Sequence, residues 1–175
     1  MPSLDDSSLT LPADHLDRLD RFDRAILEQL QQDGRMSNQA LADAVALSPS
    51  PCLRRVKRLE EAGLIKRYVA LLAPEKIGLG LLAFVSVRLQ KFDGRLRHAK
   101  SPIEDFAAAV ATWKEVVSCY VMTGEADYLM RVHVQDMAHF SEFVMQRLMT
   151  HPAVVDVKSS FALQAIKETT ALPLP

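Results

Sequence analysis

Cationic side chains gather in the first third of the chain, at Arg54, Arg55, Lys57 and Arg58. An apolar stripe at a spacing of three residues runs between them, formed by Leu53, Val56 and Leu59. This spacing predicts a helix with one inward side, and because each helical residue turns by about 100°, the cations spread over the exposed side. Guanidinium and ammonium groups bind base edges and phosphates, so the pattern indicates a surface for nucleic acid.

Charge is unevenly distributed along the sequence. Residues 48–67 carry six cations and two anions, a balance of +4, whereas the whole chain of 175 residues has a net charge of -1, which leaves -5 for the rest. A basic island on an acidic body suits a protein that binds DNA through one surface, because neutralising phosphates drives such binding. The alternative is a solvated charged face, with Arg58 paired to nearby Glu61.

Two further helical patterns precede the basic helix. Leu19, Phe22, Ile26 and Leu30 recur at three- and four-residue spacing, and Ser37 is a suitable N-cap for a short helix that follows. Either Ser48 or Ser50 can cap the third helix, at residues 48–64, where backbone N–H groups suit phosphate. Three helices at this spacing predict a helix-turn-helix whose last helix lies on DNA.

The cations of the third helix receive specific expected roles. Arg54 or Arg55 is expected to read guanine with two hydrogen bonds, while Lys57, Arg58 and Lys66 suit phosphates. We expect Arg55→Ala to weaken operator binding while lowering the melting temperature by no more than about a degree or two, because changes at the surface rarely cost much stability.

The second part of the chain has a different pattern. Strands are predicted over residues 82–89, 116–122, 127–134 and 154–166, and helices over residues 103–110 and 137–148. The order βαββαβ is the ferredoxin-like arrangement, so the fold class is α+β with an N-terminal helix-turn-helix. In the second predicted strand Val117, Cys119 and Val121 share one face, and Val116, Tyr120 and Met122 share the other. Two helices cover only one face of the sheet, so a second copy is expected on the other, as a homodimer that suits paired DNA half-sites.

Close resemblance to the Lrp/AsnC regulators is carried by three stretches: LDRLDRFDRAIL at residues 16–27, GRMSN at 34–38, and LSPSPCLRRVKRLE at 47–60, followed by AGLI at 62–65. The Ser-Pro-x-Pro-Cys start most resembles the leucine-responsive branch, and the likeness covers residues 16–167. It implies a winged helix-turn-helix, a hinge strand and an effector-binding βαββαβ domain. Family members form dimers and often octamers, and many bind amino acids that change their assembly or DNA affinity.

Domain boundaries and DNA contacts follow from these patterns. We expect a flexible tail at residues 1–15, the helix-turn-helix at 16–66, a hinge strand and linker at 67–81, an effector-binding and oligomerisation domain at 82–167, and a C-terminal tail at 168–175. The predicted contacts to double-stranded DNA are Asn38, Ser48, Ser50, Pro51, Arg54, Arg55, Lys57 and Arg58.

The resemblance places the effector site where dimers meet, around the turn at residues 122–128. The family pattern Gly-x-x-Asp-[Tyr/Phe] is matched at Gly124, Asp127 and Tyr128. Asp127 can bind an ammonium group, and the Gly124 turn can expose N–H donors to a carboxylate; a plain hairpin turn is the alternative. The predicted effector residues are Val121, Gly124, Glu125, Asp127, Tyr128, Met137, Ser160, Phe161 and Ala162. Leucine or another apolar amino acid is the expected effector. Relatives often carry a larger or β-branched residue where this chain has Ser160, so the side-chain preference of the effector is left open.

Other chemistry is poorly supported by the sequence. Cys52 and Cys119 are far apart, and the histidines lack the tight spacing of a metal site, so we expect small buried thiols, no metal and no cofactor. No apolar run approaches the ~20 residues of a membrane span, and the acidic start does not resemble a secretory signal, so a cytoplasmic protein is expected.

Two alternatives compete with an amino-acid-responsive regulator. Some proteins of similar fold are sirohaem decarboxylases that have lost DNA binding, and the basic helix argues against that enzyme. An architectural DNA-binding protein without an effector is the other alternative, and it differs from a regulator in gaining no stability from any amino acid.

Overall fold

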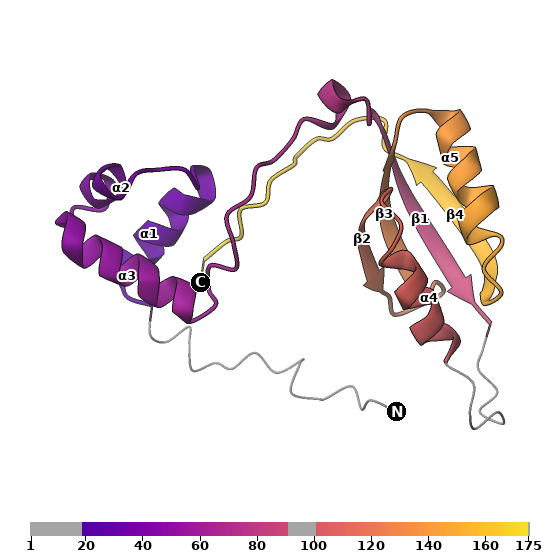
Figure 1. Ribbon diagram of the computed structural model, residues 1–175, viewed down its shortest axis with the longest axis horizontal. Helices are drawn as coiled ribbons and strands as arrows, with labels where there is room; N and C mark the ends of the chain where they lie inside the picture. Colours follow the sequence, from indigo (N-terminus) through magenta and orange to yellow (C-terminus); the bar gives the residue numbers. More distant parts are fainter. Residues whose placement is uncertain (1–18, 91–100, 175) are drawn as a thin grey trace. The chain divides into compact units, whose positions relative to one another are not determined.

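The computed structural model describes residues 19–90 and 101–174 (Figure 1). The chain divides into two compact units: Met1–Ala70 together with Lys167–Pro175, named here the helical unit, and Leu71–Ile166, named the sheet unit. The predicted tail at residues 1–15, the first three residues of the predicted helix-turn-helix domain at 16–66, and residues 91–100 between the predicted strand at 82–89 and the predicted helix at 103–110 lie outside the described residues.

Three helices build the helical unit: α1 at Arg21–Gln32, α2 at Asn38–Ala44 and α3 at Pro49–Glu61. The carboxylate of Asp20 accepts hydrogen bonds from the N–H groups of Phe22 and Asp23, which starts α1 at residue 21. Ser37 caps α2 as predicted, accepting from the N–H of Ala40 at 3.1 Å. The buried core of the unit consists of Leu19, Ile26, Leu27, Leu41, Ala42, Val45, Cys52 and Leu59.

The segment after α3 is held at its beginning but forms no strand. Tyr68 donates a hydrogen bond of 3.0 Å to the carboxylate of Glu60, and its ring packs over Gly34. Residues 66–73 lack strand structure, and a short 3-10 helix follows at Pro74–Ile77. Within the described residues of one copy, the predicted hinge strand has no hydrogen-bonded neighbour, because the sheet there is built from four other strands.

The sheet unit has the predicted βαββαβ order. Its elements are β1 at Leu81–Leu89, α4 at Pro102–Val110, β2 at Val116–Val121, β3 at Tyr128–Val134, α5 at Met137–Phe143 and β4 at Val154–Phe161. A π-helical turn at Val144–Leu148 continues α5. The strands form one antiparallel sheet in the order β2-β3-β1-β4, so the predicted ferredoxin-like arrangement is confirmed.

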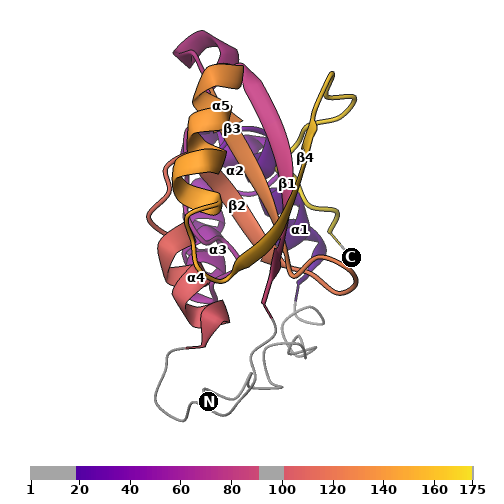
Figure 2. The same cartoon turned by 90° about the vertical axis from the view of Figure 1, so that its right-hand side faces the viewer.

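Both helices of the sheet unit cover the same face of the sheet (Figure 2). Alternate residues of β1 and β3 point to that face and are buried, among them Val85, Val87, Met130 and Val132. Phe106 of α4 and Phe143 of α5 are also buried, and Trp113 packs edge-on against both rings. This core fixes the two helices on the sheet.

The other face of the sheet is open and partly apolar. Phe84, Tyr120 and Met122 are all exposed there, and Arg131 lies across from Phe84. The strand faces differ from the prediction at one point, because the register of β2 shifts between Val116 and Ser118. Val116 therefore shares the helix-covered face with Cys119 and Val121, and Val117 occupies the irregular position.

Across the described residues, none of the helices is both long and apolar enough to span a membrane. No group of three or more His, Cys, Asp or Glu side chains in that part of the chain is arranged to hold a metal ion. Both cysteines are free thiols, and burial raises the pKa of each.

Candidate functional site

The inward side of α3 differs by one residue from the predicted stripe. Cys52 and Leu59 are buried, Val56 is half-buried, and Leu53 is 44% exposed. Positions 52, 55, 56 and 59, which are buried or half-buried, follow helical spacing, and this places Arg55 on the inward side between Cys52 and Leu59. The prediction that Leu53 points inward is therefore wrong.

Arg55 is held by two carboxylates of the first helix. Its Nη1 atom lies 2.7 Å from Oδ2 of Asp20 and 2.9 Å from Oδ1 of Asp23. The hydrogen bonds to Asp20 and Asp23 raise the pKa of Arg55 further above its ordinary value. The backbone N–H of Asp23, together with Arg55, lowers the pKa of Asp20. The prediction of a freely exposed Arg55 is therefore wrong, because its side chain is paired with Asp20 and Asp23.

Asp23 is the centre of this ion-pair network. Its side chain is fully buried, and its carboxylate binds both Arg55 and Arg58 and accepts a hydrogen bond of 3.3 Å from the N–H of Asp20. Arg58 thus pairs with Asp23 rather than with Glu61, while keeping 58% of its side chain exposed. A buried carboxylate between two arginines fixes the orientation of α3 against α1, since losing either charge leaves the other uncompensated.

The exposed face of α3 carries three of the predicted DNA contacts. Ser50, Arg54 and Lys57 follow one another at four- and three-residue spacing and are all exposed. No ion pair involves Arg54 or Lys57 within the described residues. These side chains are available to a ligand that approaches the outer side of α3.

The remaining predicted DNA contacts lie around the start of α3. Ser48 is the exposed N-cap residue and Pro51 stands in the first turn, but the Ser48 side chain makes no capping hydrogen bond. The amide nitrogen of Asn38 donates to the carbonyl of Pro49 at 3.0 Å, which ties the start of α2 to the start of α3. Ala46, between the two helices, has a φ of 54°, a left-handed conformation that ordinary residues rarely adopt.

The turn between β2 and β3 carries the motif residues of the predicted effector site. Gly124 has a φ of 114°, which only glycine adopts without strain. Asp127 does more than a local turn residue, because its Oδ2 atom accepts a hydrogen bond of 2.7 Å from the N–H of Leu89. Its own N–H donates to the carbonyl of Val87. Asp127 therefore fixes the turn to the end of β1.

The nine predicted effector residues fall into two groups at opposite ends of the sheet. Tyr128 pairs with Val87 near the end of β1, whereas Phe161 pairs with Ala83 near its beginning. Four strand residues separate these positions by about 13 Å. The turn group is Val121, Gly124, Glu125, Asp127 and Tyr128; the far group is Met137, Ser160, Phe161 and Ala162. A single copy does not bring the two groups into one site.

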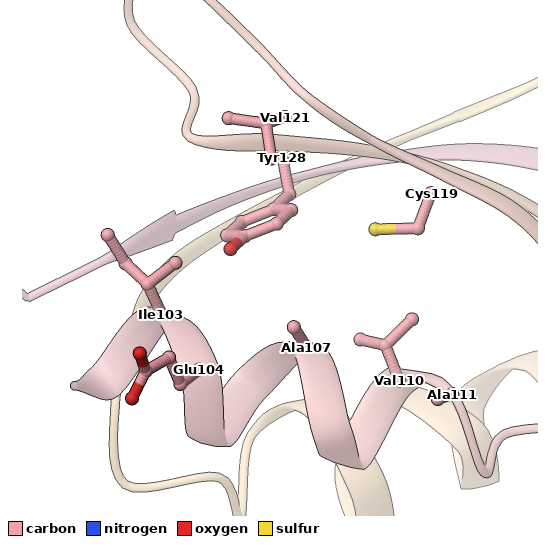
Figure 3. A pocket seen from close by; sticks show the side chains of 8 residues that line it. All are labelled: Ile103, Glu104, Ala107, Val110, Ala111, Cys119, Val121 and Tyr128. Carbon is pink, nitrogen blue, oxygen red and sulfur yellow. The ribbon is translucent and has the colours of Figure 1, made fainter. Parts of the chain in front are cut away.

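A pocket of about 460 Å³ lies beside the turn group, between α4 and the sheet (Figure 3). Its lining residues are Ile103, Glu104, Ala107, Val110, Ala111, Cys119, Val121 and Tyr128. The Tyr128 ring and the Cys119 sulfur point into the space, and Glu104 lies on the same helix as Ile103 at one end. Burial raises the pKa values of the Cys119 thiol and the Tyr128 phenol, so both groups stay neutral. The pocket suits an apolar group.

Sequence reasoning missed two sets of residues. Asp20 and Asp23 escaped notice because acidic residues are common on helix surfaces, although their spacing of three is a capping-box signal. Asp23 also interrupts the apolar positions of Leu19 and Ile26 at helical spacing, a sign of a buried charge with a partner. The α4 residues of the pocket, by contrast, carry no chemical signal in the sequence.

The two parts of the chain match known families. Residues 82–172 match the family described as the Lrp/AsnC ligand binding domain, and residues 19–66 match a winged helix-turn-helix DNA-binding family. The chain belongs to the Lrp/AsnC family. The class of function predicted from the sequence, a DNA-binding transcription regulator with a ligand-binding domain, is thereby confirmed.

Lrp/AsnC relatives of this chain include proteins named as transcription regulators. It is 47% identical over 156 residues to the DNA-binding transcriptional activator DecR of Escherichia coli, which covers 89% of this chain and 99% of the relative. It is 40% identical over 154 residues to the leucine-responsive regulatory protein of Salmonella typhimurium, with 88% and 90% covered.

Solved structures of Lrp/AsnC regulators have the same fold. A transcriptional regulator of Neisseria meningitidis, in complex with L-Met, is 51% identical, with a TM-score of 0.83 over 89% of this chain and 97% of that chain. An AsnC family regulator of Agrobacterium tumefaciens is 40% identical, with a TM-score of 0.81 and the same coverage.

Proposed function

We propose that α3 reads operator DNA with Ser50, Arg54 and Lys57. The observation that carries this assignment is their shared exposed face, because the neighbouring cation Arg55 is already bound by Asp20 and Asp23. Arg54 is the candidate for paired hydrogen bonds to guanine, and Lys57 suits a phosphate. Arg55 and Arg58 act indirectly, by fixing the helix that carries these side chains.

Two neighbouring substitutions separate contact from support. Arg54→Ala is expected to weaken binding to operator DNA by about tenfold or more, equivalent to roughly 1–3 kcal/mol, with an unchanged melting temperature. Arg55→Ala is expected to lower the melting temperature clearly, by removing one counterion of the buried Asp23. Fluorescence anisotropy with labelled duplex and thermal unfolding followed by circular dichroism measure the two effects. The opposite pattern would assign base reading to Arg55.

We further propose that an apolar amino acid is the effector, with its side chain in the pocket beside α4. The apolar lining and the neutral Tyr128 and Cys119 support an uncharged, flexible side chain such as that of methionine or leucine. The Neisseria meningitidis relative, which is 51% identical, was solved with L-Met. That complex makes L-methionine the first ligand to test.

Polar groups for the two charged ends of an amino acid lie near the pocket. Glu104 lines it and offers a carboxylate to the ammonium group. The Oδ2 atom of Asp127 accepts a hydrogen bond from the N–H of Leu89, so the first role of Asp127 is to hold the turn. Only its other carboxylate oxygen is left to bind a ligand. The glycine turn at Gly124 presents backbone groups suited to the effector carboxylate.

We propose that the complete effector site is shared between copies of the chain. The turn group and the far group of predicted residues lie at opposite ends of one sheet, so a second copy is needed to join them. Within the described residues, the Nε atom of Arg131 on the open face is buried without a hydrogen-bond partner. A second sheet packed on this face would cover the exposed Phe84 and Tyr120 and bring acceptors to Arg131.

Thermal shift with amino acids tests the effector proposal. A hundredfold excess of L-methionine over its dissociation constant is expected to add about 2.7 kcal/mol of stability. Ala107→Phe, which fills the pocket, should abolish this shift, while Ala108→Phe at the exposed neighbouring position should keep it. A panel of the twenty amino acids in which none raises the melting temperature would argue against an amino-acid effector.

Light scattering tests the assembly. A homodimer, with octamers as the higher form, is expected at micromolar concentration. Arg131→Glu should weaken the dimer, because it places a negative charge opposite the hydrogen-bond acceptors expected on the second copy. A strictly monomeric mass at that concentration would contradict the shared site.

A further inference from the structure

The residues that follow the sheet unit return to the helical unit and bind it. Residues 167–174, named here the return segment and drawn in yellow in Figure 1, belong to the helical unit although the chain reaches them from β4. Ile166, the last residue of the sheet unit, is 88% exposed, whereas Leu174 packs against the core of the helical unit. The chain therefore connects the two units twice, through residues 71–80 and through the residues that lead to this segment.

One side chain of α1 binds both the N–H and the carbonyl group of one residue in the return segment. The Gln31 Oε1 atom accepts a hydrogen bond of 2.6 Å from the N–H of Leu172, and its Nε2 atom donates one of 3.1 Å to the carbonyl of the same residue. The glutamine amide thereby makes the same pair of hydrogen bonds to Leu172 that the backbone of a neighbouring strand would make. The recognition requires an extended backbone at Leu172, which Pro173 favours in the residue before it.

Leu174 completes the contact with an apolar group. It is partly buried against the core that includes Leu27 and Leu59, whereas Leu172 is 72% exposed. Gln31 therefore reads the backbone and Leu174 supplies the apolar contact. The two hydrogen bonds are made by α1, the helix whose Asp23 holds the DNA-reading helix.

We propose that this docking makes the return segment a second tether of the helical unit. Leu172 lies eleven residues along the chain from Phe161, the last residue of β4, so the tether spans at most about 40 Å. A unit held at two points samples fewer orientations than a unit on one linker, which lowers the entropic cost of placing two recognition helices on paired half-sites. This benefit rests on the homodimer proposed above, but the docking itself does not.

The docking is tested by hydrogen exchange in the full chain. Gln31→Ala should speed exchange of the Leu172 amide by about tenfold or more, while Gln32→Ala, an exposed neighbour on the same helix, should leave it unchanged. Unchanged exchange of the α1 amides in Gln31→Ala guards against a general effect of the substitution on the helix. Unchanged exchange in Gln31→Ala would overturn the docking.

The tether is tested by binding to two DNA lengths. Duplexes selected from a random pool by the wild-type protein are prepared with both half-sites or with one. Gln31→Ala and Leu172→Pro should weaken binding to the paired site by roughly three- to tenfold and leave the single site unaffected. Equal losses on both duplexes would indicate damage to the helical unit. No loss on either duplex would mean that the docking does not strengthen binding to the paired site. Each of these results overturns the tether. Wild-type protein that binds both duplexes equally and scatters light as a monomer would contradict the homodimer, and the exchange experiment would still decide the docking.

Discussion

The two units of this regulator present their binding residues in different ways. The proposed DNA surface lies on one face of α3, so a single copy holds Ser50, Arg54 and Lys57 together. The predicted effector residues lie at both ends of one sheet, so a single copy holds only part of them. A helix brings residues that are close in sequence onto one face. A sheet can separate residues that a sequence pattern assigns to the same site.

Support is also distributed differently in the two units. The position of α3 depends on charged side chains, because Asp23 is buried between Arg55 and Arg58. The pocket beside the turn depends on packing, since Phe106 touches the rings of Trp113, Tyr128 and His151. Removing one charge should therefore affect the helical unit more than trimming one side chain affects the sheet unit.

The largest effect is expected from Asp23→Ala. The change leaves Arg55 and Arg58 without their shared carboxylate, and the free energy of unfolding should fall by about 3 kcal/mol. Urea unfolding followed by circular dichroism measures it, with Glu28→Ala on the exposed side of α1 as the control. A loss no larger than that of the control would mean that the network does not support α3.

A mixture of two variants tests whether the effector site is shared. Val121→Glu and Met137→Glu should each weaken L-methionine binding by about 2 kcal/mol, because each places a charge among apolar contacts. Subunits of the two variants refolded together should recover about a quarter of the sites, those assembled from two unaltered groups. Calorimetric titration counts the sites, with Ala138→Glu as the control. Absence of recovery would place both groups in one copy or in separate sites.

A smaller and stabilising effect is expected at Ala46. Its φ of 54° is unfavourable for alanine, so Ala46→Gly should raise the free energy of unfolding by about 0.5–1 kcal/mol. Ala44→Gly, at the end of α2, should lower it. Thermal unfolding of both variants measures these changes in stability. A loss of stability in Ala46→Gly would exclude backbone strain at residue 46.

The smallest effect concerns Tyr68 at high pH. Burial, together with the hydrogen bond to Glu60, raises the pKa of Tyr68 from 10.0 to about 12. Its contribution to stability is therefore complete below pH 10 and is lost as the pH rises toward 12. Tyr68 is 47% exposed, so solvent limits the effect to about 0.5 kcal/mol. Urea midpoints at pH 8 and 11 should differ less in Tyr68→Phe than in wild type; equal differences would count against this assignment.

Local signals in the sequence predicted most of the elements but missed their exact faces. Ser37 and the apolar spacing located α2, and the alternation of β1 located the first strand. The inward side of α3 was placed one residue away because leucine is more apolar than Cys52, and Arg55 looks like a surface residue until Asp23 is known to face it. The irregular position in β2 has no local signal, so the faces of Val116 and Val117 were exchanged.

Long-range arrangement was the part that the sequence could not supply. The motif at Gly124, Asp127 and Tyr128 located the turn, but its distance from Ser160 depends on strand register. Binding of Asp127 to the N–H of Leu89 joins residues 38 positions apart. The docking of Leu172 on Gln31 joins residues 141 positions apart, and the residues expected to form a plain tail show no periodic pattern there.

The ion pairs around Asp23 also determine how DNA binding responds to salt. Each phosphate that a free cation neutralises releases bound counterions, and it adds about 0.9 to the slope of log affinity against log salt concentration. Arg55 and Arg58 already have protein counterions, so α3 releases fewer ions than its four cations suggest. Operator affinity should therefore vary less with ionic strength than the charge of the recognition helix implies.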